Sequence, residues 1–227
     1  MREPVIPALR FNVLTRFYDP LMAIVLREST WKAQLVDQVG ATKGMHVLDL
    51  GCGTGTLTLL LAQATPDAQV VGVDADAEVL ERARTKAAAT MELVEGTAGS
   101  LPFPDASFDR VVSSLLFHHL TLAGKRAALA ESRRVLRSGG ELHVADWGRP
   151  HDALMRVAFL PVQLLDGFET TSDNVRGALP ALMAAAGFDR VQETRRRRTA
   201  FGTLAFLRAR AGGATKEDVS TPARIAG

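Results

Sequence analysis

Residues 46–74 form the stretch that most restricts the fold of this chain. In order, the stretch reads as a strand, a glycine loop, a short helix and a second strand, at residues 46–50, 51–55, 57–64 and 70–73. Apolar runs bounded by turn residues are typical of strands buried on both faces, and a helix between two such strands implies that they are parallel. The sequence therefore predicts a βαβ unit within an α/β domain.

The glycine loop and the end of the second strand carry the first sign of a ligand. Gly51, Gly53 and Gly55 let the chain turn sharply after the first strand, and their missing Cβ atoms allow a ligand to approach the backbone. Asp74 ends the second strand, where an acidic side chain accepts hydrogen bonds from the two hydroxyls of a ribose. We therefore expect a ligand that contains an adenosine.

The spacing of the glycines separates two adenosine cofactors. Dinucleotide-binding loops have the pattern G-x-G-x-x-G, in which the third glycine supports close packing beside the pyrophosphate. This chain has Thr56 at that third position and its last glycine at Gly55, which gives G-x-G-x-G. The pattern favours a ligand without a pyrophosphate.

Residues 47–55 closely resemble motif I of the class I S-adenosylmethionine-dependent methyltransferases. The resemblance continues downstream and covers roughly residues 45–146, through the segments 71–74, 100–103, 107–109 and 134–140. The subgroup that the chain resembles most is that of small methyltransferases similar to those that methylate ubiquinone and menaquinone precursors (methyltransferase type 11). The resemblance implies the methyl-transfer chemistry more firmly than the acceptor.

The resemblance implies a Rossmann-like methyltransferase fold, an α/β doubly wound and mostly parallel seven-stranded sheet. We expect one domain over residues 1–211, divided into a helical cap (8–40), a cofactor-binding half (45–146) and a substrate-side insertion with a C-terminal hairpin (147–211). A short turn joins the last two strands, so they must pair antiparallel. Residues 212–227 read as a flexible tail.

Start and stop residues predict the remaining elements. Strands are expected at 91–95, 109–114, 141–145, 189–199 and 203–210, and helices at 77–89, 121–137 and 173–186. Asp76 and Ser172 are the predicted N-caps of the first and last of these helices. Gly139 and Gly140 are expected to end the middle one in a left-handed conformation.

The resemblance also implies a set of cofactor contacts at the ends of the first four strands. These residues are Asp49, Gly51, Cys52, Gly53, Gly55, Asp74, Ala75, Thr97, Ala98, Ser114 and Leu115. The family often has an acidic residue at the position of Thr97, which bonds the adenine amino group. In this chain we expect the Thr97 hydroxyl or main-chain groups near Ala98 to make that contact instead. Ser114 and Leu115 leave the fourth strand at the ligand edge and should border the methionine part of the cofactor.

Four side chains are candidates for catalysis. Methyl transfer from a sulfonium is an in-line displacement, so a base is needed only when the acceptor carries a proton. His118 and His119 follow the fourth strand, and we expect one of them, His119, to face the acceptor as the base. Asp146 is the second candidate base, and Tyr18 in the cap is expected to close over the donor or the acceptor. The alternative roles are packing or capping for the histidines, turn formation for Asp146 and packing of the cap for Tyr18.

Composition restricts the class of partner. The net charge of +2 is too small to indicate nucleic acid, and the single cysteine excludes internal disulfides and thiolate metal clusters. We expect no metal site, because adjacent histidines cannot easily bind one ion together. The run Arg195–Arg198 reads either as a charged edge strand or as a patch that binds anions or a membrane.

The sequence leaves three functions open. The first is a methyltransferase that acts on a small, apolar or aromatic molecule, because the segment 154–165 after the fifth strand is strongly apolar. The second is a non-catalytic protein that binds the cofactor as a regulator or scaffold. The third is a methyltransferase that acts at a membrane surface on a quinone precursor or a phospholipid. No apolar run has the length of a membrane span and no signal peptide is seen, so we expect a cytoplasmic location. The oligomeric state stays open.

Overall fold

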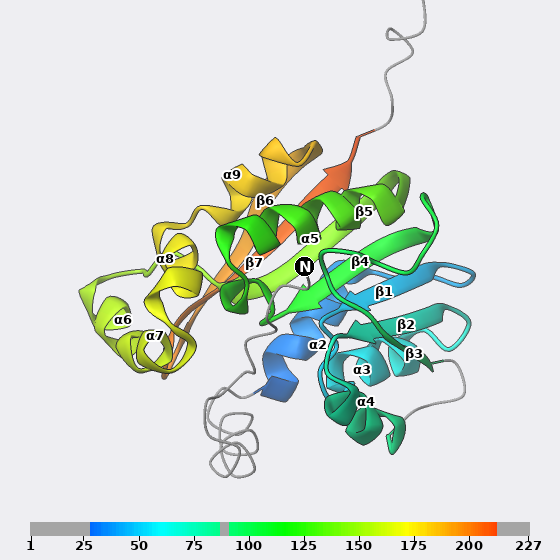
Figure 1. The fold of residues 1–227 in the computed structure, drawn as a ribbon, viewed down its shortest axis with the longest axis horizontal. Coiled ribbons are helices and arrows are strands. Elements are labelled where there is room, and N and C mark those ends of the chain that lie inside the picture. The colour runs from blue at the N-terminus through cyan, green and yellow to red at the C-terminus, as the bar shows by residue number, and fades with distance from the viewer. Residues whose placement is uncertain (1–27, 87–90, 213–227) are drawn as a thin grey trace, which may run out of the picture.

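A computed structural model of the chain describes residues 28–86 and 91–212 (Figure 1). The predictions that concern residues 8–27, including the role of Tyr18, lie outside the described residues. The predicted tail lies outside them too, apart from Gly212.

The sheet has seven strands in the order β3-β2-β1-β4-β5-β7-β6. The strands are β1 (His46–Leu50), β2 (Gln69–Asp74), β3 (Met91–Glu95), β4 (Phe108–Ser114), β5 (Leu136–Trp147), β6 (Phe188–Thr199) and β7 (Gly202–Ala211). Strands β1 to β5 pair in parallel, whereas β7 pairs antiparallel with both β5 and β6. This confirms the predicted doubly wound sheet with a C-terminal hairpin at one edge.

Nine helical segments accompany the sheet within the described residues. They are α2 (Glu28–Val39), α3 (Thr56–Ala64), α4 (Ala77–Arg84), the 3-10 helix η1 (Phe117–His119), α5 (Leu122–Val135), α6 (Ala153–Ala158), α7 (Leu160–Asp166), α8 (Phe168–Arg176) and α9 (Leu179–Ala185). Asp76 caps α4 as predicted, because its carboxylate accepts the N–H groups of Glu78 and Val79.

Helices pack on both faces of the sheet and bury two apolar cores (Figure 1). On one face, Trp31 and Leu35 of α2 and Leu57 of α3 pack against the sheet. On the other face, Leu129 of α5 and Met183 of α9 pack against it. The central strands are therefore buried on both faces, as their continuous apolar sequences predicted.

Helix α5 ends two residues before the predicted boundary. It stops at Val135, and Gly139 and Gly140 lie inside β5 rather than at a helix end. Leu136 is buried and pairs with Phe108 of β4, so the chain enters the sheet directly from the helix. Gly139 has the positive φ angle (79°) that was predicted for a helix cap. In the structure, however, it lies within β5, where the register between β4 and β5 shifts.

The predicted helix over 173–186 is wrong. Two shorter helices, α8 and α9, replace it, because Gly177 adopts a left-handed conformation (φ 72°) and the next helix starts at Leu179 with Pro180 in its first turn. Ser172 is not a cap: it lies within α8, where its hydroxyl donates to the carbonyl of Phe168. Helix α4 is also shorter than predicted and ends at Arg84.

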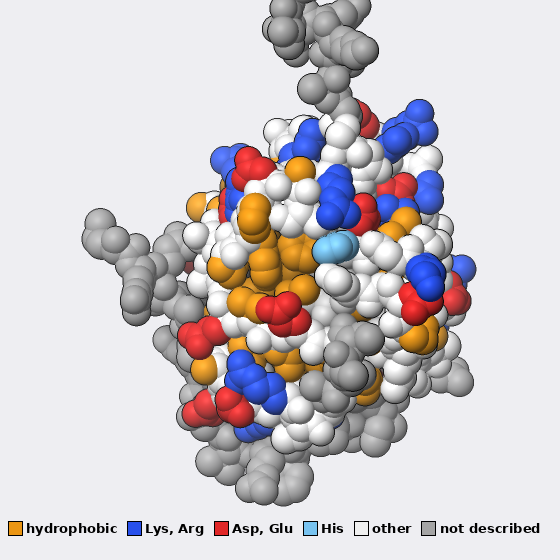
Figure 2. All heavy atoms as spheres, turned by 90° about the vertical axis from the view of Figure 1, so that its right-hand side faces the viewer, with side chains coloured by type: hydrophobic (Ala, Val, Ile, Leu, Met, Phe, Trp, Pro, Cys, Tyr) orange, Lys and Arg blue, Asp and Glu red, His pale blue; other side chains and the backbone are white. Residues whose placement is uncertain are grey.

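The surface differs between the two ends of the molecule. Figure 2 views the side opposite to α6 and α7, where hydrophobic side chains lie among both basic and acidic groups. Large apolar side chains with substantial exposure concentrate in α6, α7 and the start of α8, at Leu154, Val157, Leu160, Leu164, Leu165 and Phe168. In the described part of the chain, no helix combines the length and the apolar character that crossing a bilayer requires.

Candidate cofactor and acceptor site

The candidate residues meet at the carboxyl edge of the parallel strands. The register pairs Leu50 of β1 with Val73 of β2 and with Ser113 of β4, and pairs Ser114 with Ala145 of β5. The loops that follow these strands therefore leave the sheet side by side. An edge of this kind, where the strand order reverses, is where open α/β sheets bind ligands.

The glycine loop turns tightly over the end of β1. The N–H groups of Gly51 and Cys52 both donate to the Val73 carbonyl, over 2.8 and 3.0 Å. Gly51, Gly53 and Gly55 all have positive φ angles, of 71°, 55° and 73°. Such angles are disfavoured for residues that carry a Cβ atom, which explains the glycines at these positions.

The three glycines differ in what surrounds them. A Cβ atom on Gly51 would lie 2.8 Å from Leu116 Cδ1, and one on Gly55 would lie 3.0 Å from both Ala83 and Met91. Within the described residues, a Cβ atom on Gly53 would meet no atom within 4 Å. Gly51 and Gly55 are thus required by packing, whereas Gly53 keeps an open approach to the loop backbone. That open approach fits a bound adenosine.

Asp74 lies against the loop, as predicted. Its Oδ2 atom accepts the N–H of Gly53 over 2.8 Å, and its Oδ1 atom accepts the N–H of Asp76 over 3.0 Å. The side chain is only partly buried. A carboxylate offers about four lone-pair positions, so these two bonds leave capacity for the hydroxyls of a ribose. Asp74 therefore fits the predicted ribose contact.

Asp49 and Cys52 support the loop from the protein interior. Asp49 is fully buried, accepts the Thr58 hydroxyl over 2.7 Å, and burial raises its pKa to about 6. Burial also raises the pKa of the Cys52 thiol well above its ordinary value, which argues against a nucleophilic role. Among the described residues, the Asp49 side chain bonds Thr58 of α3 through Oδ2, and its Oδ1 atom has no hydrogen-bond partner.

The other predicted cofactor residues lie along the same edge. Ala75 and Thr97 are exposed, and Ala98 is half-buried. Ser114 and Leu115 are also half-buried, and Leu115 has a φ angle of 55°, which is unusual for a branched residue. Backbone strain of this kind concentrates at functional sites.

His118 and Asp146 form a buried pair. The His118 Nδ1 atom lies 2.8 Å from Asp146 Oδ1, and both side chains are almost fully buried. Asp146 also accepts the N–H groups of Phe117 and Trp147, each over 2.7 Å, and an amide N–H of Asn174 over 3.3 Å. The Asp146 carboxylate is thus occupied by protein donors, and its position favours orienting His118 over taking a proton from an acceptor.

His119 is the more accessible histidine. Its side chain is 34% exposed, and its Nδ1 atom lies 4.0 Å from Asp166 Oδ1. Burial of the ring and the neighbouring His118 lower the pKa of His119 well below its ordinary value, which keeps the ring neutral at pH 7. The two histidine rings lie 3.9 Å apart and both reach toward Asp166, although consecutive residues were expected to point in different directions.

Sequence reasoning missed Asp166, Lys125 and Asn174. Asp166 is the last residue of α7, and burial raises its pKa. Lys125 of α5 is fully buried; its Nζ atom donates to the Thr170 carbonyl over 2.5 Å and lies 3.5 Å from Asp173. Asn174 joins α8 to the end of β5. The sequence offers one sign of such a residue, namely an acidic side chain within an otherwise apolar segment, as at Asp166 within residues 154–168.

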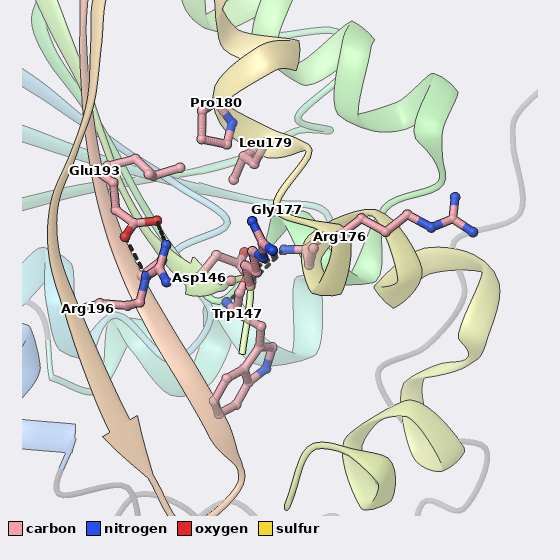
Figure 3. A pocket seen from close by; sticks show the side chains of 13 residues that line it. Asp146, Trp147, Arg176, Gly177, Leu179, Pro180, Glu193 and Arg196 are labelled. Carbon is pink, nitrogen blue, oxygen red and sulfur yellow. Dashed lines mark hydrogen bonds and ion pairs between the residues drawn. The ribbon is translucent and has the colours of Figure 1, made fainter. Parts of the chain in front are cut away.

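A separate cavity of about 240 Å³ lies beside the C-terminal hairpin (Figure 3). Residues of β6, β7, α8 and α9 line it, with Asp146 and Trp147 at its wall, and an ion pair between Glu193 and Arg196 borders it. None of the glycine-loop residues and neither His118 nor His119 lines this cavity. The cavity is separate from the glycine loop but adjoins the predicted acceptor site at Asp146, which lines it.

Comparison with known proteins agrees with this geometry. Residues 47–140 match the family model of a methyltransferase domain. The chain is 32% identical over 188 residues to the ubiquinone/menaquinone biosynthesis C-methyltransferase UbiE of Shewanella oneidensis. The aligned region covers 72% of this chain and 74% of that protein. It is 34% identical over 157 residues to the demethylmenaquinone methyltransferase of Symbiobacterium thermophilum. This alignment covers 66% of this chain and 62% of that protein.

The fold agrees with solved structures. The YcgJ protein of Bacillus subtilis superposes with a TM-score of 0.65 at 20% identity, over 81% of this chain and 98% of that chain. The sheet, the glycine loop and the sequence relatives thus agree. The chain belongs to the class I S-adenosylmethionine-dependent methyltransferases, in the UbiE-like group, and S-adenosylmethionine is its cofactor.

Proposed function

We propose that the chain methylates an apolar ring that carries a hydroxyl group, of the kind found in reduced quinone precursors. The main support is that His119 and Asp166 lie at the cofactor edge, next to a rim of exposed apolar side chains. Leu164, Leu165 and Phe168, which surround Asp166 in the sequence, are 73%, 49% and 49% exposed. An apolar rim around a few polar groups is typical of small-molecule sites. The proposal extends to this chain the acceptors that the names of its relatives indicate.

Bound S-adenosylmethionine would supply a methyl group on a sulfonium, which an acceptor aligned with the carbon–sulfur bond would take while the bonding electrons stay on sulfur. His119 takes the proton that the acceptor loses, because its neutral ring has a lone pair available. Asp146 is a positioning residue that holds His118, and His118 packs against the His119 ring. The protein's main contribution is alignment of donor and acceptor in a site with little water.

The proposed cofactor contacts follow the loops at the strand ends. The backbone at Gly53 lies against the adenosine, and Asp74 binds the ribose hydroxyls. Ala75, Thr97 and Ala98 border the adenine, whereas Ser114 and Leu115 border the methionine part. The open space at Gly53 and the remaining acceptor capacity of Asp74 support these assignments.

The test is methyl transfer to a panel of acceptors, followed by mass spectrometry. Reduced naphthoquinones, catechols and simple aliphatic amines are compared, and a product heavier by one methylene from the hydroxylated rings is the expected result. His119→Gln should lower kcat by about 100- to 10,000-fold while leaving donor affinity unchanged. His151→Gln, at a histidine that bonds Thr203, is the matched control. Transfer to amines alone, or full activity of His119→Gln, would contradict the proposal.

A second candidate is action on an acceptor held in a lipid surface. Of the large apolar side chains that are exposed in the described residues, all but Leu122 lie within 154–168. A membrane-bound acceptor would explain why apolar groups gather beside the proposed acceptor site. Co-sedimentation with anionic and neutral vesicles tests this: pelleting that Leu164→Ser reduces supports it, and no pelleting at low salt contradicts it. Either form of the proposal includes a cytoplasmic location, which cell fractionation would check.

A further inference from the structure

Three side chains of the acceptor site converge on a gap that they do not bridge. The donor atoms of His118, His119 and Asp166 all lie within 4.8 Å of one another. The His118 Nε2 atom is 3.6 Å from Asp166 Oδ2, and the His119 Nδ1 atom is 4.0 Å from Asp166 Oδ1. Both distances are too long for a hydrogen bond.

The orientation of His118 makes this arrangement unusual. Its Nδ1 atom faces Asp146 at 2.8 Å, and a neutral ring that donates this N–H carries its lone pair on Nε2. The Nε2 lone pair then faces the Asp166 carboxylate. His118 therefore lies between two carboxylates, Asp146 at 2.8 Å and Asp166 at 3.6 Å, and its Nε2 atom is directed at the gap beside Asp166.

We propose that His118, His119 and Asp166 form a binding site for a divalent first-row transition-metal ion. In tetrahedral zinc sites, bonds of about 2.0–2.2 Å place neighbouring ligand atoms about 3.4 Å apart. The separations of 3.6 and 4.0 Å run to the two different oxygens of Asp166, and one donor atom from each residue lies within 4.8 Å of the others, so the side chains would rotate inward to close the site. Two imidazoles and one carboxylate suit Zn²⁺ and Co²⁺.

The surroundings of the three ligands match those of known metal sites. A ligating histidine usually donates its other ring N–H to a carboxylate, which fixes the tautomer and orients the ring. Asp146 does this for His118, and is itself held by the N–H groups of Phe117 and Trp147. Asp166 comes from α7, far from the histidines in sequence, so ligand spacing along the chain could not reveal the site.

The bound ion blocks the reaction. Metal ligation uses the same lone pair of His119 that takes the proton in the proposed reaction, so an occupied site cannot accept that proton there. We therefore expect the ion to inhibit methyl transfer without changing donor affinity. This consequence rests on the proposed function, whereas the binding of the ion does not.

Titration with Co²⁺ tests binding, on the full chain without a histidine tag. One Co²⁺ per chain should bind and give the intense visible absorption of a low-coordinate site. His119→Gln and Asp166→Asn should each weaken binding by at least about tenfold, since even residues that only support ligands change affinity by 10- to 100-fold. His151→Gln should bind as the parent does, and circular dichroism confirms folding. Absence of the absorption, or equal binding by all variants, would overturn the site.

Methyl transfer measured with and without Zn²⁺ tests the consequence. Competition between Zn²⁺ and Co²⁺ first gives the Zn²⁺ concentration at which the site is filled. Inhibition of methyl transfer at that Zn²⁺ concentration, reversed by a chelator, supports the inference. Full activity with a filled site would overturn the inhibitory role. Failure of the metal-free protein to methylate any hydroxylated ring, with Co²⁺ binding intact, would instead count against the proposed function.

Discussion

The cofactor half and the segment from α6 to α8 are built in different ways. The cofactor half rests on buried parallel strands, and its ligand loop is held mainly by backbone bonds such as those from Gly51 and Cys52 to Val73. The segment from α6 to α8 consists of three short helices and is joined to the rest by buried polar side chains. The proposed donor site therefore depends on local backbone geometry, whereas the proposed acceptor site depends on long-range side-chain contacts.

This difference matches the needs of the two ligands. Every methyltransferase of the family binds the same donor, so a rigid loop on a buried sheet suffices. Acceptors vary, and short helices that expose apolar side chains can change with little effect on the sheet. The comparison predicts that the two regions can be damaged separately.

Replacing Asp74 should damage the donor site alone, and by the largest amount. Asp74→Ala removes hydrogen bonds to a charged group, each worth about 1.5–3 kcal/mol, so donor affinity should fall by roughly 100-fold. The far-ultraviolet circular dichroism should stay unchanged, because the side chain lies at the surface of the loop. Calorimetric titration with the donor measures the effect. Unchanged affinity would show that the ribose lies elsewhere.

The pH dependence of stability should reveal the buried Asp49. Its pKa of about 6 in the folded state exceeds the ordinary value of 3.8, so the folded protein holds this proton more tightly than the unfolded chain. The contribution of Asp49 to stability is therefore largest at low pH and is lost as the pH rises through about 4 to 6. Asp49→Asn should lose this dependence, so the variant gains up to about 3 kcal/mol relative to the parent across that range.

Urea unfolding of both proteins at several pH values measures this change. The comparison isolates Asp49, because the other titrating groups are common to both chains. Parallel stability curves for the two proteins would contradict the assignment of the raised pKa to Asp49.

Two glycines of one loop should respond differently to the same substitution. Gly51→Ala places a Cβ atom 2.8 Å from Leu116 Cδ1 and should cost roughly 1–3 kcal/mol of stability. Gly53→Ala meets no atom of residues 28–86 or 91–212, so it should cost about 1 kcal/mol of stability from its positive φ angle but weaken donor binding by about tenfold. Thermal unfolding and donor titration, run on both variants, separate the two effects. Equal donor affinity in Gly53→Ala and the parent would refute close approach at Gly53.

The smallest effect is expected in α8. The Asn174 amide donates to the Trp147 carbonyl over 3.0 Å and to Asp146 over 3.3 Å, and Asn174→Ala should cost about 1–2 kcal/mol. Hydrogen exchange should accelerate in α8 while β1 and α3 keep their protection. Faster exchange throughout the sheet would show that the two regions are not separable.

The same difference explains what could be predicted from the sequence. The βαβ unit, the glycine loop and Asp74 follow from local patterns, and the structure confirms the doubly wound sheet that the family resemblance implied. The convergence of Asp166 on the histidines depends on how α7 packs, and no pattern along the chain records that contact. The misplaced helix over 173–186 has the same origin, because Gly177 was hidden within an apparently continuous helical sequence.

The contact between Leu116 and Gly51 couples the two halves mechanically. Leu116 stands immediately before the turn that carries both histidines, and its side chain fills the space where Gly51 lacks a Cβ atom. A substitution at Leu116 would therefore be felt both by the glycine loop and by the turn that carries the histidines.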